Sequence, residues 1–418
     1  MSVFSRAVST LRHEGVASTA WRVGKWMSSR GNPFAEKPLQ SVFRQDVIAA
    51  DWTRPRKFVA GPLVSSTGRP QIAWVISPPG RSSGGHQNAF RFMRYLEEAG
   101  YDLTVFLYSA TTYPKVSVAG VTHMLAGNAS YPPLDASFKV YDPATGVVGD
   151  FDAVVASDWA TAYAAWRYEP NVPRIYWVQD FEPYFFPQSP DYVVAENSYR
   201  LGLHGITVGP WLANKLRRDY GMACDSYEYA ADASVYQRTN DEKRSEIMFY
   251  ARPSTGRRGT EFGLLVLEEL HRRRPDITIN IAGWDMSKAG LTFPFVNHGT
   301  LSVADLPPLY NRCAAMLTIS LTCASLVPFE NIACGTIPVV NDGENTRESL
   351  RDDSRIAFVP LSVGAMVDAL IEAVDRPDQV THSRALAQSM VGSSWSEAGD
   401  VVVDVFRKQL TLKKRGSS

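Results

Sequence analysis

Long apolar segments are missing from this chain of 418 residues. No run approaches the ~20 consecutive apolar residues that cross a bilayer. The first thirty residues have charges throughout and no apolar core, so a secretory signal peptide is not expected. Cysteine is also scarce: the four cysteines form no Cys-x-x-Cys pair and have no nearby histidine at ligand spacing. We therefore expect reduced thiols in a cytoplasmic protein, and no metal site.

An excess of charge of either sign is absent as well. Lys plus Arg and Asp plus Glu number 43 each, so the global charge does not point to a nucleic-acid partner. Charged residues make up only 21% of the chain and hydrophobic residues 45%, which is typical of a globular protein. The length exceeds what one core normally holds, and about two domains are expected.

Basic residues and apolar residues at helical spacing are interleaved near the start of the chain. The apolar positions include Trp21 and Trp26, and Arg22 and Lys25 lie between them. A basic helix with tryptophan can lie in a membrane interface. It can equally dock its apolar stripe on its own protein. Both alternatives stay open, so contact of residues 1–30 with the inner face of a membrane is one expectation.

Short apolar strands alternate with amphipathic helices from Gln71 onward. This alternation predicts parallel sheets that helices cover on both faces. A charged linker without hydrophobic residues interrupts it at 239–245, and the alternation then restarts. We predict an α/β protein with two doubly wound, Rossmann-like domains that face a central cleft. Its expected parts are a basic helix and a connector of little regular structure at 1–69, a first domain at 70–238 and a second domain at 239–394.

One carboxylate is predicted to lie at a ligand-binding edge. A strand ending at Ile319 is followed by a polar loop, a short helix, a stop at Gly335 and a further buried strand. Glu330 falls in the first turn of this helix, at the edge where open α/β sheets bind ligands. The helix start stabilises its charge, while its oxygens stay free to accept hydrogen bonds from hydroxyl groups. The alternative is a glutamate that only caps the helix.

A loop rich in Gly, Ser and Pro joins the first strand to the first helix and ends in Gly84, Gly85 and His86. Adjacent glycines at a helix start let a ligand approach the backbone amides closely. The loop matches neither the dinucleotide-binding fingerprint nor a P-loop. His86 is a candidate catalytic residue, and the alternative is a histidine that only caps the helix.

Three arginines follow the first strand of the second domain within seven residues, namely Arg252, Arg257 and Arg258, and Gly259 comes directly after them. Guanidinium groups match phosphate geometry with two parallel hydrogen bonds. We predict that these arginines bind a diphosphate and neutralise it as it leaves, in place of a metal ion. The alternative is a solvated basic loop.

Asp180 and Glu182 follow a strand of the first domain within a segment that also holds four aromatic residues. Aromatic faces beside hydrogen-bonding groups suit sugars, so we predict that a sugar acceptor lies against this loop. The alternative is that the aromatic side chains belong to the core.

Together these segments resemble retaining glycosyltransferases with the GT-B fold, glycosyltransferase family 4. A more specific resemblance is to bacterial rhamnosyltransferases that include S-layer glycan enzymes. The resemblance covers about residues 70–410 and is carried by Gly-Gly-His-Gln87, Gln-Asp-Phe-Glu-Pro183, Phe-Tyr-Ala-Arg-Pro253 and Pro-Phe-Glu330 with Gly335.

The resemblance implies that the second domain binds a nucleotide-sugar donor, with dTDP-L-rhamnose as the expected donor and no further cofactor. It assigns the ribose to Glu330, and the diphosphate to Arg252 and either Arg257 or Arg258, beside Gly259. Thr322 stands eight positions before Glu330, where the family has a further glutamate that contacts the donor sugar. This departure suits a deoxysugar, which has fewer hydroxyl groups.

The resemblance also implies a bacterial surface-glycan acceptor, free or lipid-linked, on the side of the first domain. That acceptor would lie against Gly84, Gly85, His86 and the loop of Asp180 and Glu182. Transfer is expected to retain the anomeric configuration, and a C-terminal helix at 395–410 is expected to cross back to the first domain. Three alternatives stay open: an inverting reaction with Asp180 or Glu182 as general base, a nucleotide-sugar epimerase, and a non-catalytic scaffold of the same fold.

Overall fold

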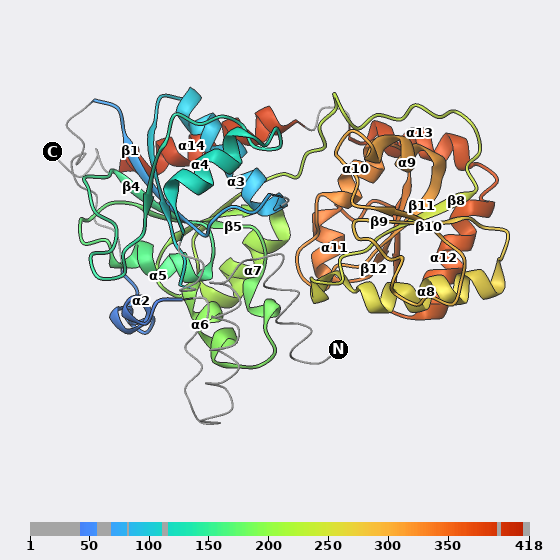
Figure 1. The fold of residues 1–418 in the computed structure, drawn as a ribbon, viewed down its shortest axis with the longest axis horizontal. Coiled ribbons are helices and arrows are strands. Elements are labelled where there is room, and N and C mark those ends of the chain that lie inside the picture. Colours follow the sequence, from blue (N-terminus) through green and yellow to red (C-terminus); the bar gives the residue numbers. More distant parts are fainter. Residues whose placement is uncertain (1–41, 57–67, 82, 111–115, 391–393, 413–418) are drawn as a thin grey trace, which may run out of the picture.

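The computed structural model describes residues 42–56, 68–81, 83–110, 116–390 and 394–412. Two α/β domains lie side by side along the longest axis of the molecule (Figure 1). The segment 228–245 connects the last strand of the first sheet to the first strand of the second. The basic helix expected within residues 1–30 lies outside the described residues.

The first domain is built on a seven-stranded sheet in the order β3-β2-β1-β4-β5-β6-β7, and all neighbouring strands are parallel. The order reverses between β1 and β4, and open sheets of this kind bind ligands near such a reversal. The elements are α2 (Arg44–Ala49), β1 (Gln71–Ile76), α3 (Gly84–Glu98), β2 (Asp102–Leu107), α4 (Val118–Ala126), β3 (Ser137–Val140), β4 (Ala153–Ala156), α5 (Trp159–Arg167), β5 (Arg174–Val178), the 3-10 helix η1 (Glu182–Phe185), α6 (Pro190–Ser198), β6 (His204–Val208), α7 (Pro210–Tyr220) and β7 (Cys224–Tyr227).

The second domain has a six-stranded parallel sheet in the order β10-β9-β8-β11-β12-β13. In Figure 1, α8 and α12 lie on one face of this sheet, and α9, α10 and α13 on the other. The elements are β8 (Glu246–Tyr250), the 3-10 helix η2 (Gly256–Arg258), α8 (Thr260–Arg273), β9 (Ile279–Ala282), β10 (Val296–Gly299), α9 (Leu306–Arg312), β11 (Cys313–Thr318), α10 (Val327–Ala333), β12 (Ile337–Asn341), α11 (Glu344–Ser349), β13 (Ala357–Val359), α12 (Val363–Asp375) and α13 (Gln379–Gln388).

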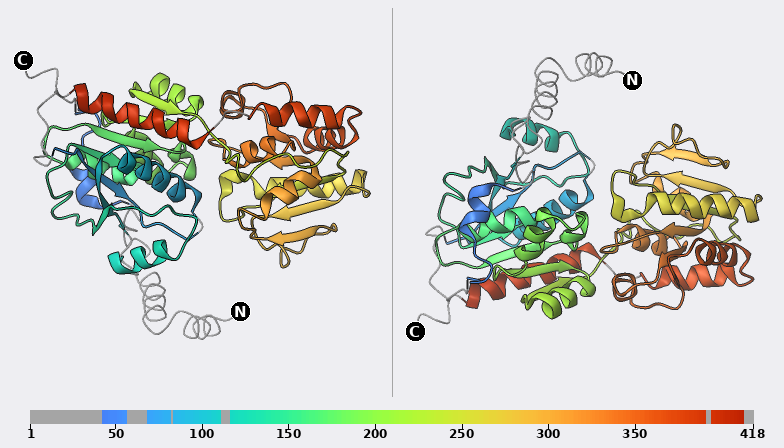
Figure 2. Two further views of the ribbon diagram at one scale, coloured as in Figure 1. Left: turned by 90° about the horizontal axis from the view of Figure 1, so that it is seen from above. Right: turned by 90° about the horizontal axis from the view of Figure 1, so that it is seen from below.

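The last helix, α14 (Trp395–Leu412), returns to the first domain and lies along it (Figure 2). Its Phe406 meets Tyr101 with ring centroids 6.1 Å apart. The guanidinium carbon of Arg91, on α3, lies 4.1 Å from the centre of the Trp395 ring. The predicted crossing of the C-terminal helix back to the first domain is therefore confirmed.

The connector predicted at 31–69 has more regular structure than expected. It contains helix α2, which buries the carboxylate of Asp46 completely. That carboxylate accepts hydrogen bonds from the hydroxyls of Tyr108 at 3.0 Å and Tyr141 at 2.7 Å, and it pairs with Arg167. A buried charge is tolerated only with such partners. The prediction missed the helix because it is anchored by residues far away in the sequence.

The interior strands of both sheets are the short apolar strands of the predicted alternation, which did not include β3, β7, β10 or β13. These are the two outermost strands of each sheet. Edge strands are paired on one side only, and β3 and β10 are largely exposed. β3 and β10 therefore lack the continuous hydrophobic run that marks a buried parallel strand. The predicted stop at Gly335 is present, with φ at +73°, directly after α10 and its cap.

Three kinds of feature are absent from the part of the chain that the structure describes. No helix there is both long and apolar enough to cross a membrane. No three or more His, Cys, Asp or Glu side chains gather there as metal ligands. No disulfide joins the four cysteines, which are all buried. Burial raises the pKa of each thiol, so the thiols stay protonated and unreactive at neutral pH.

Candidate active site between the two domains

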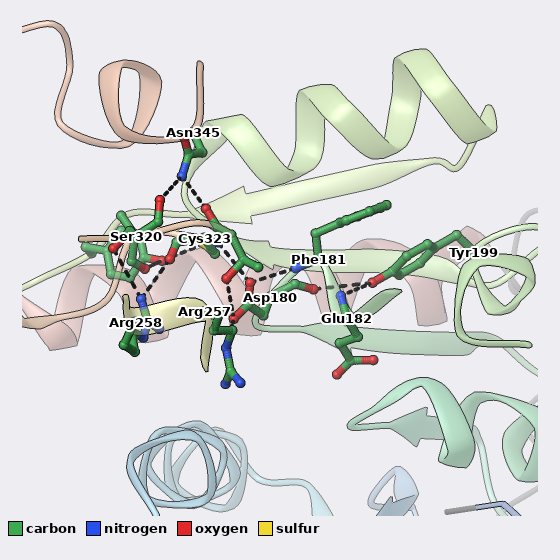
Figure 3. A network of polar contacts seen from close by, with 12 residues as sticks. Asp180, Phe181, Glu182, Tyr199, Arg257, Arg258, Ser320, Cys323 and Asn345 are labelled. Carbon is green, nitrogen blue, oxygen red and sulfur yellow. Dashed lines mark hydrogen bonds and ion pairs between the residues drawn. The ribbon is translucent and has the colours of Figure 1, made fainter. Parts of the chain in front are cut away.

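The carboxyl ends of both sheets meet at one interface. The loop that follows β5 of the first domain touches the loops that follow β8 and β11 of the second (Figure 3). Asp180 lies at the centre: its Oδ2 is 3.0 Å from Nε of Arg257. It also accepts hydrogen bonds from the Thr322 hydroxyl at 3.1 Å and from the Cys323 backbone N–H at 2.9 Å. The structure thus brings together Asp180, Arg257 and Thr322, which were predicted from separate motifs.

The two adjacent arginines of the loop have different surroundings. The Arg257 guanidinium carbon lies 3.9 Å from the centre of the Phe185 ring, which belongs to the first domain. Arg258 stays within the second domain and donates hydrogen bonds to Ser320 Oγ at 3.3 Å and to the carbonyl oxygen of Cys323 at 3.0 Å. Arg258 therefore braces the loop after β11, whereas Arg257 reaches across the interface.

Gly259 ends the turn that carries both arginines and begins α8. Its φ is +57°, in the left-handed region that favours glycine. A Cβ at this position would lie 2.5 Å from Cγ2 of Ile319, on the neighbouring loop. Conformation and packing therefore both require glycine here, and the tight turn keeps the arginines at the edge of the sheet.

Arg252 follows β8 directly. Its backbone N–H donates to the hydroxyl of Thr260 at 2.9 Å, which fixes the start of the loop. Its guanidinium carbon lies 5.9 Å from the centre of the Tyr250 ring. Among the described residues, the structure assigns this guanidinium no hydrogen-bond or ion-pair partner. Its five donors are therefore available for an anion.

Glu330 lies in the first turn of α10, as predicted, and two tyrosines hold its carboxylate. The Tyr310 hydroxyl donates to Oε2 at 3.2 Å, and Tyr236 donates a second hydrogen bond. Burial raises the pKa of Glu330 to about 7, and these hydrogen bonds and the charge of Arg91 oppose the rise. Because Arg91 belongs to α3, this electrostatic interaction reaches Glu330 from the first domain.

The glycine pair at the start of α3 contacts the loop that carries Asp180. The side-chain amide of Gln179 donates to the carbonyl oxygen of Gly85 at 3.1 Å, and its oxygen accepts from Asn88 at 3.2 Å. Among the described residues, no atom lies within 4 Å of the position that a Cβ would take on Gly84. The backbone of Gly84 is therefore open to approach, and ligand binding at this glycine pair stays a prediction.

His86 points into its own loop. Its Nε2 lies 2.9 Å from the carbonyl oxygen of Ser77, and its Nδ1 lies 2.6 Å from the hydroxyl of Ser83. Burial lowers the pKa of His86. These contacts suit a neutral imidazole in which Nε2 donates and Nδ1 accepts. They favour the alternative that this histidine braces the helix start.

Glu182 lies apart from the other candidates. Its carboxylate accepts hydrogen bonds from the backbone N–H of Trp159 at 2.6 Å and the hydroxyl of Tyr176 at 2.5 Å, both within the first domain. Burial, reinforced by the charge of Asp158, raises its pKa well above the usual range. Figure 3 shows this carboxylate turned away from the network around Asp180. The structure does not bring Glu182 to the interface.

Several residues of the site were not predicted as such. Tyr310 and Tyr236 hold Glu330, and Asn345 donates to the carbonyl oxygens of Ser320 (2.9 Å) and Thr322. Tyr236 lies in the segment 228–245 that connects the two sheets. Tyr310 and Asn345 are single polar residues of ordinary helices, and no motif marks them.

Two comparisons with known sequences found relatives, and the family match lies in the second domain. Residues 245–371 match the family described as the C-terminal domain of WsaF. Over 202 residues, the chain is 31% identical to the O-antigen biosynthesis protein RfbC of Myxococcus xanthus. The aligned region is 47% of this chain but only 16% of that protein, so the chain spans a small part of this relative.

Solved structures resemble both domains together. A mutant of S. aureus TarM, in complex with fondaparinux, α-GlcNAc-glycerol and UDP, superposes with a TM-score of 0.61 at 7% identity, covering 81% of this chain and 99% of that one. A glycosyltransferase from Rickettsia africae gives a TM-score of 0.58 at 12% identity, covering 82% and 99%. The chain has the GT-B fold. This confirms the predicted fold class, and at these identities the likeness shows the fold alone.

Proposed function

We propose that this protein is a glycosyltransferase that moves a sugar from a nucleoside-diphosphate sugar onto a surface-glycan acceptor. The observation that carries the proposal is a pair at the carboxyl edge of the second domain: Glu330, held by tyrosine hydroxyls, and Arg252, whose donors are available. Tyr250 lies within electrostatic reach of both. Similarity to the WsaF C-terminal domain and to an O-antigen biosynthesis protein supports this assignment.

In this proposal the donor lies on the second domain. Its ribose hydroxyls donate to the Glu330 carboxylate. Its diphosphate accepts hydrogen bonds from Arg252, from the terminal nitrogens of Arg257 and from Nη2 of Arg258, whose Nη1 is held by Ser320 and Cys323. Preorganised guanidinium donors stabilise the charge that develops on the diphosphate as the sugar leaves, and they need no reorganisation at that moment.

The acceptor lies on the first domain, near the exposed backbone of Gly84 and Gly85. The acceptor oxygen bonds to the anomeric carbon while the bond from that carbon to the phosphate oxygen breaks. The acceptor proton passes to the departing phosphate oxygen on the same face, so the configuration is retained. Two observations favour this over an inverting mechanism: the Asp180 carboxylate already accepts hydrogen bonds at the domain interface, and Glu182 is turned away.

For the donor we propose dTDP-L-rhamnose. Support comes from Thr322, which stands where the family resemblance places a sugar-binding glutamate. Its hydroxyl donates to Asp180 and it is only 1% exposed, so it adds no acceptor for a sugar hydroxyl. A deoxysugar needs fewer such acceptors.

Peripheral contact with the inner face of a membrane through residues 1–30 is a further part of the proposal. Its support is the basic, tryptophan-containing pattern of that segment. The test is co-sedimentation with vesicles of anionic phospholipid. The full chain should pellet with the vesicles, and a variant without residues 1–30 should stay in the supernatant. Equal behaviour of the two would overturn the proposed contact.

The central test is calorimetric titration of the full chain with dTDP, UDP and GDP without added metal. Binding of dTDP that is lost in Glu330→Ala would support a thymidine-linked donor and the assigned ribose site. Preference for UDP or GDP would keep the transferase and overturn the proposed donor. Failure of all three nucleotides to bind would overturn the transferase. In a separate assay, turnover of a nucleotide-sugar donor without an acceptor would favour an epimerase.

A further inference from the structure

Asp180 is a residue of the first domain whose carboxylate is held mostly by the second. Oδ2 faces Arg257 Nε at 3.0 Å and the Thr322 hydroxyl at 3.1 Å. Oδ1 accepts from the backbone N–H groups of Cys323 and Phe181, each at 2.9 Å. Three of these four donors cross the domain interface (Figure 3). With only 6% of its surface exposed, Asp180 is bound as a buried bridge.

This geometry leaves the carboxylate little capacity for chemistry. An ionised carboxylate has about four lone-pair positions for hydrogen bonds. All of them are used here, two on each oxygen. A general base needs a free lone pair directed at the proton it removes. The contacts of Asp180 therefore suit a residue that orients its neighbours.

The neighbour that depends most on Asp180 is Arg257. Its Nε is taken by the carboxylate, and one face of its guanidinium is covered by the Phe185 ring, 3.9 Å from the guanidinium carbon. Asp180 and Phe185 belong to the same loop of the first domain. Among the described residues, the terminal nitrogens of Arg257 have no hydrogen-bond partner. Residues of the first domain thus fix the orientation of Arg257, which belongs to the second domain.

We infer that Asp180 is a positioning residue for Arg257, which couples closure of the two domains to assembly of the anion-binding site. Separation of the domains would remove both the Asp180 carboxylate and the Phe185 ring from Arg257. The guanidinium would then lose its fixed direction. The ligand in this inference rests on the proposed function, because the anion is the diphosphate of a nucleotide sugar. The bridge itself rests on geometry alone.

A second ion pair across the interface supplies a matched control. Arg218 on α7 and Glu344 on α11 lie 2.5 Å apart, and each side chain is about half exposed. Loss of either carboxylate removes one interdomain ion pair. Of these two carboxylates, only that of Asp180 contacts the loop that carries Arg257 and Arg258. Glu344→Gln therefore separates general adhesion between the domains from positioning of Arg257.

The test is a double-mutant cycle with Asp180→Asn and Arg257→Ala in the full chain, read as the dissociation constant for dTDP, UDP or GDP, whichever the wild type binds. Asp180→Asn should weaken binding about tenfold, because one charge-assisted contact no longer orients the guanidinium. In the Arg257→Ala background the same change should have no further effect. Glu344→Gln should leave the affinity as it is.

The affinity of Asp180→Asn for the nucleotide could also change in the opposite direction. Asp180→Asn also removes a negative charge near a bound anion, which by itself favours binding. Tighter binding in Asp180→Asn would mean that Asp180 competes with the phosphate for Arg257, and would overturn the inference. Equal losses in both Arg257 backgrounds, or a loss in Glu344→Gln as large as in Asp180→Asn, would overturn it as well.

Small-angle X-ray scattering of the unliganded variants separates the bridge from the proposed function. Asp180→Asn should increase the radius of gyration, and Glu344→Gln should increase it less. If the wild type bound no nucleotide, the proposed function and the coupling to Arg257 would both fail. The scattering result would still decide whether Asp180 joins the domains. An unchanged radius in Asp180→Asn would overturn the bridge, even with nucleotide binding intact.

Discussion

Glu330 should make nucleotide binding depend on pH near neutrality, and replacing it should stabilise the protein while weakening the ligand. Burial raises the pKa of its carboxyl group from an ordinary value of 4.5 to about 7, despite two tyrosine donors. A group with such a raised pKa favours the folded state at low pH. This contribution is fully present below pH 4.5 and is lost as the pH rises to about 7.

The magnitude follows from the size of this rise. One pKa unit corresponds to about 1.4 kcal/mol, so the rise costs about 3 kcal/mol of folding free energy above neutral pH. Glu330→Gln removes the charge and keeps an oxygen that accepts a hydrogen bond from Tyr310. At pH 8 the variant should therefore be more stable by up to about 3 kcal/mol, or roughly 6–12 °C in melting temperature for a domain of this size. At pH 4.5 and below, the difference should vanish.

The assay compares wild type and Glu330→Gln by calorimetric melting at pH 4.5 and pH 8, and by nucleotide titration between pH 5.5 and pH 8.5. If ribose hydroxyls donate to the carboxylate, wild-type affinity should fall up to tenfold per pH unit below about 7. The nucleotide phosphate also titrates near pH ~6, and the variant, which lacks the carboxylate, measures that contribution alone. A variant that is less stable at pH 8, or that keeps the wild-type pH profile, would refute the reasoning.

Three further substitutions test other parts of the structure. Arg252→Ala should weaken nucleoside-diphosphate binding about tenfold or more with the melting temperature little changed, since its guanidinium has no hydrogen-bond or ion-pair partner among the described residues; a calorimetric titration that matches wild type would remove it from the diphosphate site. Gly259→Ala forces a Cβ to 2.5 Å from Ile319 at a φ of +57°. It should cost about 1–3 kcal/mol in urea unfolding, and an unchanged midpoint would contradict this packing. Asp46→Asn leaves the partly buried Arg167 without its carboxylate and should destabilise by about 3 kcal/mol, whereas a thermal melt equal to wild type would show that α2 needs no such anchor.

The sequence predicts the interior strands of both sheets and misses their edge strands. The central strands are short apolar runs whose burial on both faces demands continuous hydrophobicity. Local composition therefore reveals them. The missed strands β3, β7, β10 and β13 are the four sheet edges. One side of each has no strand partner, so polar residues are tolerated in β3, β7 and β10 and weaken the local signal there, whereas β13 is apolar but only three residues long.

The candidate site divides in the same way. Glu330 and Gly335 follow from a local pattern, because the strand–loop–helix spacing alone puts a carboxylate at a ligand edge. The partners of these residues do not follow. Tyr310 lies 20 residues before Glu330 on a different helix, and Thr322 and Cys323 lie 142 and 143 residues after Asp180. A motif places a functional group, whereas the occupancy of its lone pairs is decided by the tertiary fold.

This occupancy separates the two carboxylates of the site, the buried Asp180 and the partly buried Glu330. Asp180 has four hydrogen-bond donors, including the guanidinium of Arg257, so its oxygens are filled by the protein. Glu330 has two tyrosine hydroxyls, and the described residues give it no ion pair. The raised pKa of Glu330 is consistent with the lack of an ion pair, because burial without a close cation disfavours the charged form. A carboxylate with unfilled lone pairs gains most from a ligand that brings hydroxyl groups, whereas a filled one gains nothing. The free lone pairs of Glu330 therefore support the proposed ribose contact, and the filled ones of Asp180 support the inferred bridge between the domains.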